Sequence, residues 1–357
     1  MSHMHAVRSP TPSVVLLAVT IVAASHVSTT ASAAPGADGF DWATIGAVGN
    51  AAYAGPGPNS GRGRVNYQYK ISKLEITTSQ WLEFTNTFST QTDAYNFTKL
   101  GPLYWGATFD PTYIGPGVRY RLRQGDPNAG MRPVGGISWR DAARYCNWLH
   151  NGKSSSLASL TTGAYDTTTF GGNRTTGYSD AATHLPGAKY WIPTLDEWMK
   201  AAYYDPDRFG KGGGGWWDFT NRSNQNGVPG LPGVGTTSAG LQLPNRGEWT
   251  IALGAYSAST SPWGLLDTSG GAAEWTEEWA GRVDRATLGA AAGDILQRES
   301  TSTTEGLVFD PEEATTIIGL RIASAVPAPS TIVALGFMLY PRRKRRFSSK
   351  QRQSFWH

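Results

Sequence analysis

Three stretches of the chain repeat apolar side chains at the spacing of an amphipathic helix. In residues 78–88 the apolar positions Trp81, Phe84 and Phe88 fall three or four residues apart, which places them on one helical face. Residues 138–149 and 194–203 show the same periodicity. The pattern therefore predicts three helices in these segments.

Each predicted helix begins with a residue that can cap it. Ser138 precedes the second helix and Asp141 follows three residues later, where its carboxylate can face the positive end of the helix dipole. Thr194 precedes the third helix, and Glu197 completes a capping-box pattern. We interpret Asp141 and Glu197 as helix-start residues rather than catalytic carboxylates.

The segments between the predicted helices have no clear period. Residues 154–187 and 210–247 are rich in Gly, Thr, Asn and Pro. The chain has 14 Trp and 43 Gly with only 16% charged residues, which is typical of a loop-rich unit with an aromatic core. No internal repeat and no composition shift marks a second domain, so we expect one.

The N-terminus has the pattern of a secretory signal. An apolar run covers residues 14–24, and the small residues Ala31 and Ala33 stand where a signal peptidase requires them. We predict a signal peptide over residues 1–33 and therefore an exported protein.

The C-terminus combines a Pro-containing stretch at 326–330, an apolar run at 331–340 and a basic cluster at 342–346. This order resembles a PEP-CTERM sorting signal, although Ala328 stands where that motif has glutamate. Ten residues rise only about 15 Å as a helix, against about 30 Å of hydrocarbon. We predict that residues 325–346 anchor the body weakly or transiently outside the membrane, followed by a tail at 347–357.

The positive net charge belongs to the termini. Without Arg8 and the seven bases after residue 341, the body carries 23 bases against 27 acids. Phosphate binding needs a basic footprint on the folded domain itself. The charge distribution therefore predicts that nucleic acid is not a partner of the body.

Five ordered motifs over residues 40–324 resemble the formylglycine-generating, or sulfatase-modifying factor, family. They lie at residues 40–50, 69–77, 132–149, 190–202 and 261–275, and the pattern closes with Gly-Leu-Arg-Ile-Ala at 319–323. The resemblance implies an α+β fold, distantly like a C-type lectin, with little regular secondary structure. It leaves the activity open, because a fold does not fix a function.

The family that the chain resembles uses copper chemistry, and this chain lacks the cysteines which that chemistry requires. The family holds copper(I) with two C-terminal cysteines, and Ile322 occupies one of those positions. The single cysteine, Cys146, shares a predicted helix face with Trp139 and Leu149, so we interpret it as a core residue. A histidine-bound iron is not expected either, since after residue 33 the chain offers only three histidines: His150, His184 and His357.

A structural calcium ion is the metal that the resemblance favours. The family binds it at the turn that corresponds to residues 269–275, and oxygen ligands suit this hard cation. The ligands implied here are the Glu274 side chain, the carbonyls of Ser269, Gly270 and Ala272 and, more weakly, Asn245. Gly271 and Ala273 replace the asparagine and tryptophan of the family turn, so a plain turn with a solvated or hydrogen-bonded Glu274 is the alternative.

Three functions are consistent with the sequence. The first is an exported, envelope-associated protein whose catalytically silent domain serves as a binding or scaffold module. The second is a divergent oxidoreductase with a metal site built without cysteine, and the third is a structural component of the cell surface or exopolysaccharide matrix. We expect a monomer whose ligand is a peptide, a protein or a polysaccharide.

Overall fold

The computed structural model describes residues 37–91, 105–294, 299–303 and 307–326. The predicted signal peptide, nearly all of the predicted sorting segment and the tail lie outside these residues. Within them, 18% of residues are helical and 20% are in strands, which confirms the α+β class and the small share of regular structure. None of the helices in these residues is long and apolar enough to cross a membrane.

The three predicted helices are present, and each is capped as expected at its first turn. They are α1 (Thr78–Thr87), α2 (Trp139–His150) and α3 (Leu195–Tyr203). Thr77 and Thr194 form capping boxes with Gln80 and Glu197, while Ser138 accepts a hydrogen bond from the Asp141 backbone amide. The Asp141 side chain instead pairs with Arg144.

One four-stranded sheet has the order β1-β2-β14-β7 and only antiparallel neighbours. Its strands are β1 (Trp42–Ile45), β2 (Tyr69–Ser72), β7 (Tyr190–Trp191) and β14 (Ala323–Ala325). The first and last strands of the described domain are therefore joined through one sheet.

A second sheet has the order β12-β11-β10-β13, and its β10–β13 pair is parallel. Its strands are β10 (Ala273–Ala280), β11 (Asp284–Leu288), β12 (Leu307–Phe309) and β13 (Ile318–Gly319). Residues 318–325 thus pass directly from the second sheet to the first, and Arg321 and Ile322 lie at this junction. Gly319 is required there, because a Cβ would lie 2.3 Å from the Val134 carbonyl oxygen.

Three two-stranded hairpins and four short 3₁₀ helices complete the regular structure of the described residues. The hairpins are β3 (Ala107–Phe109) with β4 (Tyr120–Leu122), β5 (Gly172–Asn173) with β6 (Gly177–Tyr178), and β8 (Tyr204–Asp205) with β9 (Gly215–Trp216). The 3₁₀ helices are η1 (Ala129–Met131), η2 (Leu157–Leu160), η3 (Thr167–Thr169) and η4 (Pro244–Thr250).

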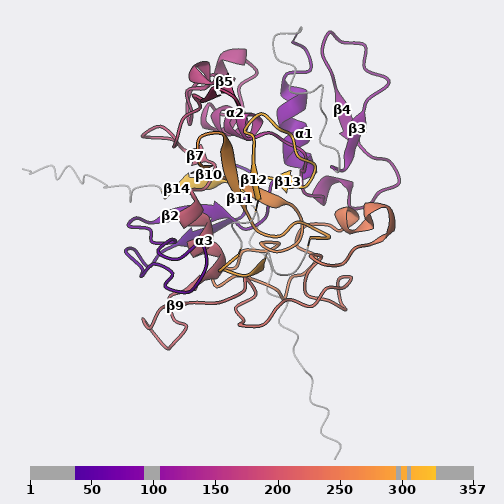
Figure 1. Ribbon diagram of the computed structural model, residues 1–357. Coiled ribbons are helices and arrows are strands. Elements are labelled where there is room, and N and C mark those ends of the chain that lie inside the picture. Colours follow the sequence, from indigo (N-terminus) through magenta and orange to yellow (C-terminus); the bar gives the residue numbers. More distant parts are fainter. Residues whose placement is uncertain (1–36, 92–104, 295–298, 304–306, 327–357) are drawn as a thin grey trace, which may run out of the picture.

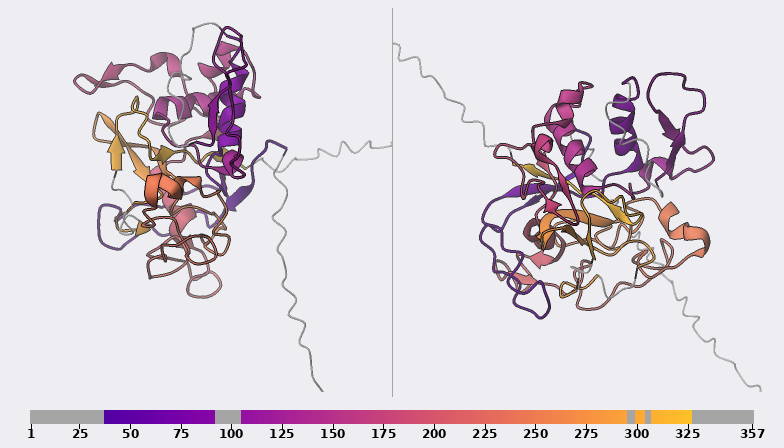
Figure 2. Two further views of the ribbon diagram at one scale, coloured as in Figure 1. Left: turned by 90° about the vertical axis from the view of Figure 1, so that its right-hand side faces the viewer. Right: turned by 45° about the horizontal axis from the view of Figure 1, so that its top comes forward.

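The helices α1 and α2 lie at one end of the molecule, and the long loops between β8 and β10 lie at the other, with the two sheets between them (Figures 1 and 2). The main core joins both sheets to α1 and α2 and is dominated by aromatic rings such as Trp139, Trp148 and Trp275. A second core packs α3 against β11, with Trp198 and Tyr203 at its centre. Both cores of the described residues are thus built around tryptophans, as the composition predicts.

Candidate functional site

Ile322, at the family's cysteine position, belongs to the main core. Its side chain is fully buried, and its backbone amide and carbonyl are both hydrogen-bonded to Ser72 of β2. An apolar side chain enclosed in this way has neither a reactive group nor access to a substrate. The position therefore supports packing between the two sheets.

Cys146 lies on the inner face of α2, also fully buried in the main core, as its helical spacing predicts. Burial, assisted by the charge of Glu277, raises the pKa of the Cys146 thiol well above its usual value. The thiol is therefore protonated at neutral pH, whereas copper(I) ligation and nucleophilic attack both require a thiolate.

Beside Ile322, the Glu274 carboxylate is paired with the Arg321 guanidinium. Arg321 Nε lies 3.1 Å from both carboxylate oxygens and its Nη2 lies 3.0 Å from one of them. The Trp198 indole N–H also donates to Glu274. Arg321 uses its remaining donors on the carbonyls of Ser72 and Leu266, and both charged side chains are 1% exposed or less. This is a buried ion pair with all its polar atoms engaged.

The turn that the resemblance assigns to calcium contributes Glu274 to this ion pair. The Ser269 carbonyl accepts a hydrogen bond from Thr237 Oγ1, and the Gly270 amide donates to the Ala290 carbonyl. Asn245 is exposed on η4 and has a left-handed backbone, with φ of 54°. The Glu274 carboxylate is positioned to accept hydrogen bonds from a guanidinium. A calcium ion bound through Glu274 would first have to displace Arg321.

Two further buried carboxyl groups share the charge of Arg321. Glu75 accepts from the Ala272 amide at 3.1 and 3.0 Å, and Asp267 accepts from the Gly254 amide at 2.6 Å. Burial raises the pKa of Glu75 well above its usual range, and the neighbouring charge of Glu274 raises it further. Burial also raises the pKa of Asp267, to about 6. We call Glu75, Asp267, Glu274 and Arg321 the buried charge centre.

The turn sequence explains why a glycine follows Gly270. Gly271 has φ of +69°, and a Cβ there would lie 2.2 Å from Oε1 of Glu75. Glycine therefore lets Glu75 approach the turn and bind the Ala272 amide. Within the part of the chain that the structure describes, no group of three or more His, Cys, Asp or Glu side chains is arranged to hold a metal ion.

A second polar network centres on Glu277 of β10. One of its carboxylate oxygens accepts from the Tyr165 hydroxyl at 2.6 Å and from the backbone and ring nitrogens of His184 at 2.8 and 2.9 Å. Burial lowers the pKa of His184, but the hydrogen bond and charge of Glu277 outweigh burial and raise it. The His184 ring also stacks on Trp191, with ring centroids 4.5 Å apart. This network ties the loop before β7 to the second sheet.

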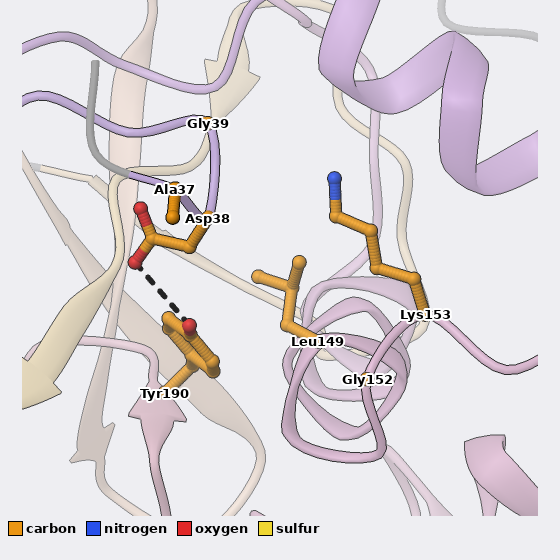
Figure 3. A pocket seen from close by; sticks show the side chains of 7 residues that line it. All are labelled: Ala37, Asp38, Gly39, Leu149, Gly152, Lys153 and Tyr190. Carbon is orange, nitrogen blue, oxygen red and sulfur yellow. Dashed lines mark hydrogen bonds between the residues drawn. The ribbon is translucent and has the colours of Figure 1, made fainter.

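A hollow of about 340 Å³ lies between the first described residues and the end of α2 (Figure 3). Asp38 accepts hydrogen bonds from Tyr190 and Trp42 on one side of it. Lys153, on the opposite side, pairs with Glu83. Both charged side chains of this hollow therefore already have protein partners.

A larger hollow of about 410 Å³ lies between the β5–β6 hairpin and the turn after β10. Its side chains include Tyr178, Trp279 and Arg282. The Arg282 guanidinium makes no ion pair with a described residue, in contrast to Lys153. We call this hollow the hairpin cleft.

Sequence reasoning identified the turn and Ile322 but missed their surroundings. Glu75 lies inside a family motif, yet its raised pKa depends on burial and on Glu274, which is distant in the chain. The equally distant Arg321 lowers that pKa. The hairpin cleft is built from two segments about a hundred residues apart, and neither shows a motif. Glycines next to a single aromatic residue were the only sequence feature that could have indicated the hairpin cleft. That combination is common in this chain, so it does not single out these two segments.

Comparisons with known proteins found one matching family and several similar solved structures. The family described as sulfatase-modifying factor enzyme 1-like domain matches residues 49–326. Similar solved structures include CarF (17% identity, TM-score 0.44, covering 80% of this chain and 98% of that one) and Treponema denticola variable protein 1 (15%, 0.47, 80% and 95%). PvdO from Pseudomonas aeruginosa is a third (14%, 0.36, 80% and 92%).

No curated protein sequence matches the chain. The family match nevertheless covers well over half of the residues, including the helices, every strand except β1, the buried charge centre and Ile322. The chain therefore belongs to the sulfatase-modifying factor enzyme 1-like domain family.

Proposed function

We propose that this protein is a binding module that keeps the family's domain without its cysteine-dependent oxidation chemistry. The observation that carries the proposal is the buried Ile322 at the family's cysteine position. Oxidation of a substrate cysteine through copper(I) needs soft thiolate ligands. The only cysteine of the sequence, Cys146, is enclosed in the core with its thiol protonated.

Incubation of the purified protein with a sulfatase-type cysteine peptide tests this proposal. Mass spectrometry is expected to find the peptide unchanged, while an active formylglycine-generating enzyme in a parallel reaction yields the aldehyde. Formation of aldehyde would overturn the proposal. Persistence of that activity in Cys146→Ala would assign it to a site without cysteine, and its loss would assign it to Cys146.

We also propose that the module works outside the cytoplasm, at the cell envelope. The support comes from the sequence: the signal pattern over residues 1–33 and the sorting-like segment over residues 325–346. Fractionation of the producing cells should place the domain in the membrane fraction, accessible to added protease. Deletion of residues 326–357 should release it in soluble form. Cytoplasmic full-length protein, or unchanged membrane association after the deletion, would contradict this placement.

A further inference from the structure

The hairpin cleft presents an unusual set of side chains for an open surface. It is lined by two aromatic rings, two hydroxyl groups and one guanidinium, from Tyr178, Trp279, Thr176, Ser179 and Arg282. The other lining positions are glycines, which add no side chain. A Cβ at Gly177 would lie 3.8 Å from the Arg282 carbonyl oxygen, so the β5–β6 hairpin and the turn after β10 are in contact here.

Each aromatic ring of the cleft has a guanidinium on its hidden side. The Arg285 guanidinium carbon lies 3.7 Å from the Trp279 ring centroid and 3.8 Å from that of Trp139, so it is held between two indoles. Arg140 lies 5.2 Å from the Tyr178 centroid. Arg285 is fully buried and Arg140 nearly so, while Tyr178 and Trp279 line the cleft, and we infer that the opposite ring faces are the ones open to it. The rings are therefore fixed platforms, and little conformational entropy is lost when a ligand stacks on them.

The charges around the cleft are unevenly compensated. Arg140 is paired with Asp180 and Glu312, and Asp310 accepts a hydrogen bond from the Tyr178 hydroxyl. Arg285, in contrast, donates to the carbonyls of Glu277 and Ala181, and its Nε has no hydrogen-bond partner among the described residues.

Arg285 remains a cation at neutral pH, although burial lowers its pKa to about 10. A cation held against one ring face offsets the negative potential of the aromatic quadrupole. The free face of Trp279 therefore presents a weaker negative potential to a ligand than an isolated indole does. Arg282 at the rim adds a second positive charge that has no carboxylate partner among the described residues, and no acid lines the cleft.

We propose that the hairpin cleft binds an acidic polysaccharide, with a sugar ring stacked on Trp279 and a uronate carboxylate on Arg282. This assignment rests on the proposed binding function and names its ligand class. Flat, fixed aromatic faces match the C–H face of a pyranose ring, and a guanidinium matches a carboxylate with two parallel hydrogen bonds. The Thr176 hydroxyl can exchange hydrogen bonds with sugar hydroxyls. An acidic peptide would satisfy Arg282 but would leave the ring platforms without a flat partner.

Affinity electrophoresis and calorimetry of the full-length protein test the proposal, with polygalacturonate as the acidic probe and dextran as the neutral one. Wild type should bind polygalacturonate and not dextran. Trp279→Ala and Arg282→Gln should each weaken binding by about tenfold, the size expected for a central aromatic or arginine contact. The matched control is Phe209→Ala, because this exposed ring also carries an arginine, Arg208, but lies outside the cleft. The control should bind like wild type.

Each other outcome overturns the assignment in a recognisable way. Equal binding of dextran would remove the requirement for charge, and equal binding of poly-L-glutamate would assign the cleft to an acidic peptide. Loss of Trp279 can expose Arg285 and unfold the hairpin, so Trp279→Phe and the exposed Arg282→Gln keep the test independent of folding. Absence of polygalacturonate binding by wild type would reject the ligand class, whereas only aldehyde formation rejects the underlying proposed function.

Discussion

The buried charge centre and the hairpin cleft use similar chemical groups in opposite ways. In the buried charge centre, Arg321 makes hydrogen bonds with each of its nitrogens, and Glu274 faces three donors. In the hairpin cleft, Arg282 is exposed and makes no ion pair with a described residue. Saturated polar groups stabilise one arrangement of the chain, while unsatisfied ones near a surface retain free energy for a ligand.

The largest expected effect comes from breaking the ion pair of the buried charge centre. Glu274→Gln leaves the Arg321 guanidinium without its closest countercharge in a water-free site, and such losses cost about 3–5 kcal/mol of unfolding free energy. Urea denaturation should measure this loss. The matched variant Arg282→Gln, at an exposed guanidinium without a paired acid, should change stability by about 0.5 kcal/mol or less. Similar losses in both variants would erase the distinction between the two regions.

The next effect is a pH dependence that arises from Asp267. Its folded pKa, about 6, lies above its ordinary value of 3.8, so the folded state holds this proton more tightly than the unfolded state does. The stabilisation is complete below about pH 4 and is lost as the pH rises toward about 6, for a total near 3 kcal/mol. Denaturation of wild type and Asp267→Asn at several pH values should show a steeper fall in wild type, because the variant keeps only the contribution of other buried carboxyl groups such as Glu75. Parallel curves would show that the pKa of Asp267 is the same in the folded and unfolded states.

Cys146→Ser should have a smaller effect, of about 1–3 kcal/mol. The hydroxyl replaces a buried thiol in an apolar part of the core, where it loses apolar burial and gains a polar group that needs a partner. Thermal unfolding should detect the change, and a thiol reagent should fail to label native wild type. Rapid native labelling of Cys146 would contradict its place in the core.

The sequence predicts features that depend on neighbours in the chain, and it fails where distant segments meet. The caps at Thr77, Ser138 and Thr194 follow local rules, and all three helices were correctly predicted. Cys146 was correctly placed in the core because helical periodicity alone identifies the inner face of α2. These predictions needed no tertiary information.

The partners of Glu274 required tertiary information. Arg321 follows Glu274 by 47 residues, and Glu75 binds an amide 197 residues away. Capping rules and periodicity do not report such pairs. The sequence therefore offered a calcium ion or a plain turn around Glu274, and the pairing with Arg321 was not predicted. The hairpin cleft was missed for the same reason, since its aromatic rings acquire their guanidinium backing only in the folded chain.

The smallest expected effect is that of calcium on the melting temperature. It tests whether Glu274 of the buried charge centre binds Arg321 or a metal ion. A ligand that binds only the folded state raises the melting temperature as its concentration grows. Because Glu274 already faces Arg321 and Trp198, we expect millimolar calcium or excess EGTA to leave the melting temperature of wild type unchanged. A shift with calcium that disappears in Glu274→Gln would restore Glu274 as a metal ligand. The Arg321 side chain would then have to move away from Glu274. The buried charge centre would be satisfied by a bound ion, and no longer by an ion pair within the chain, when it is compared with the hairpin cleft.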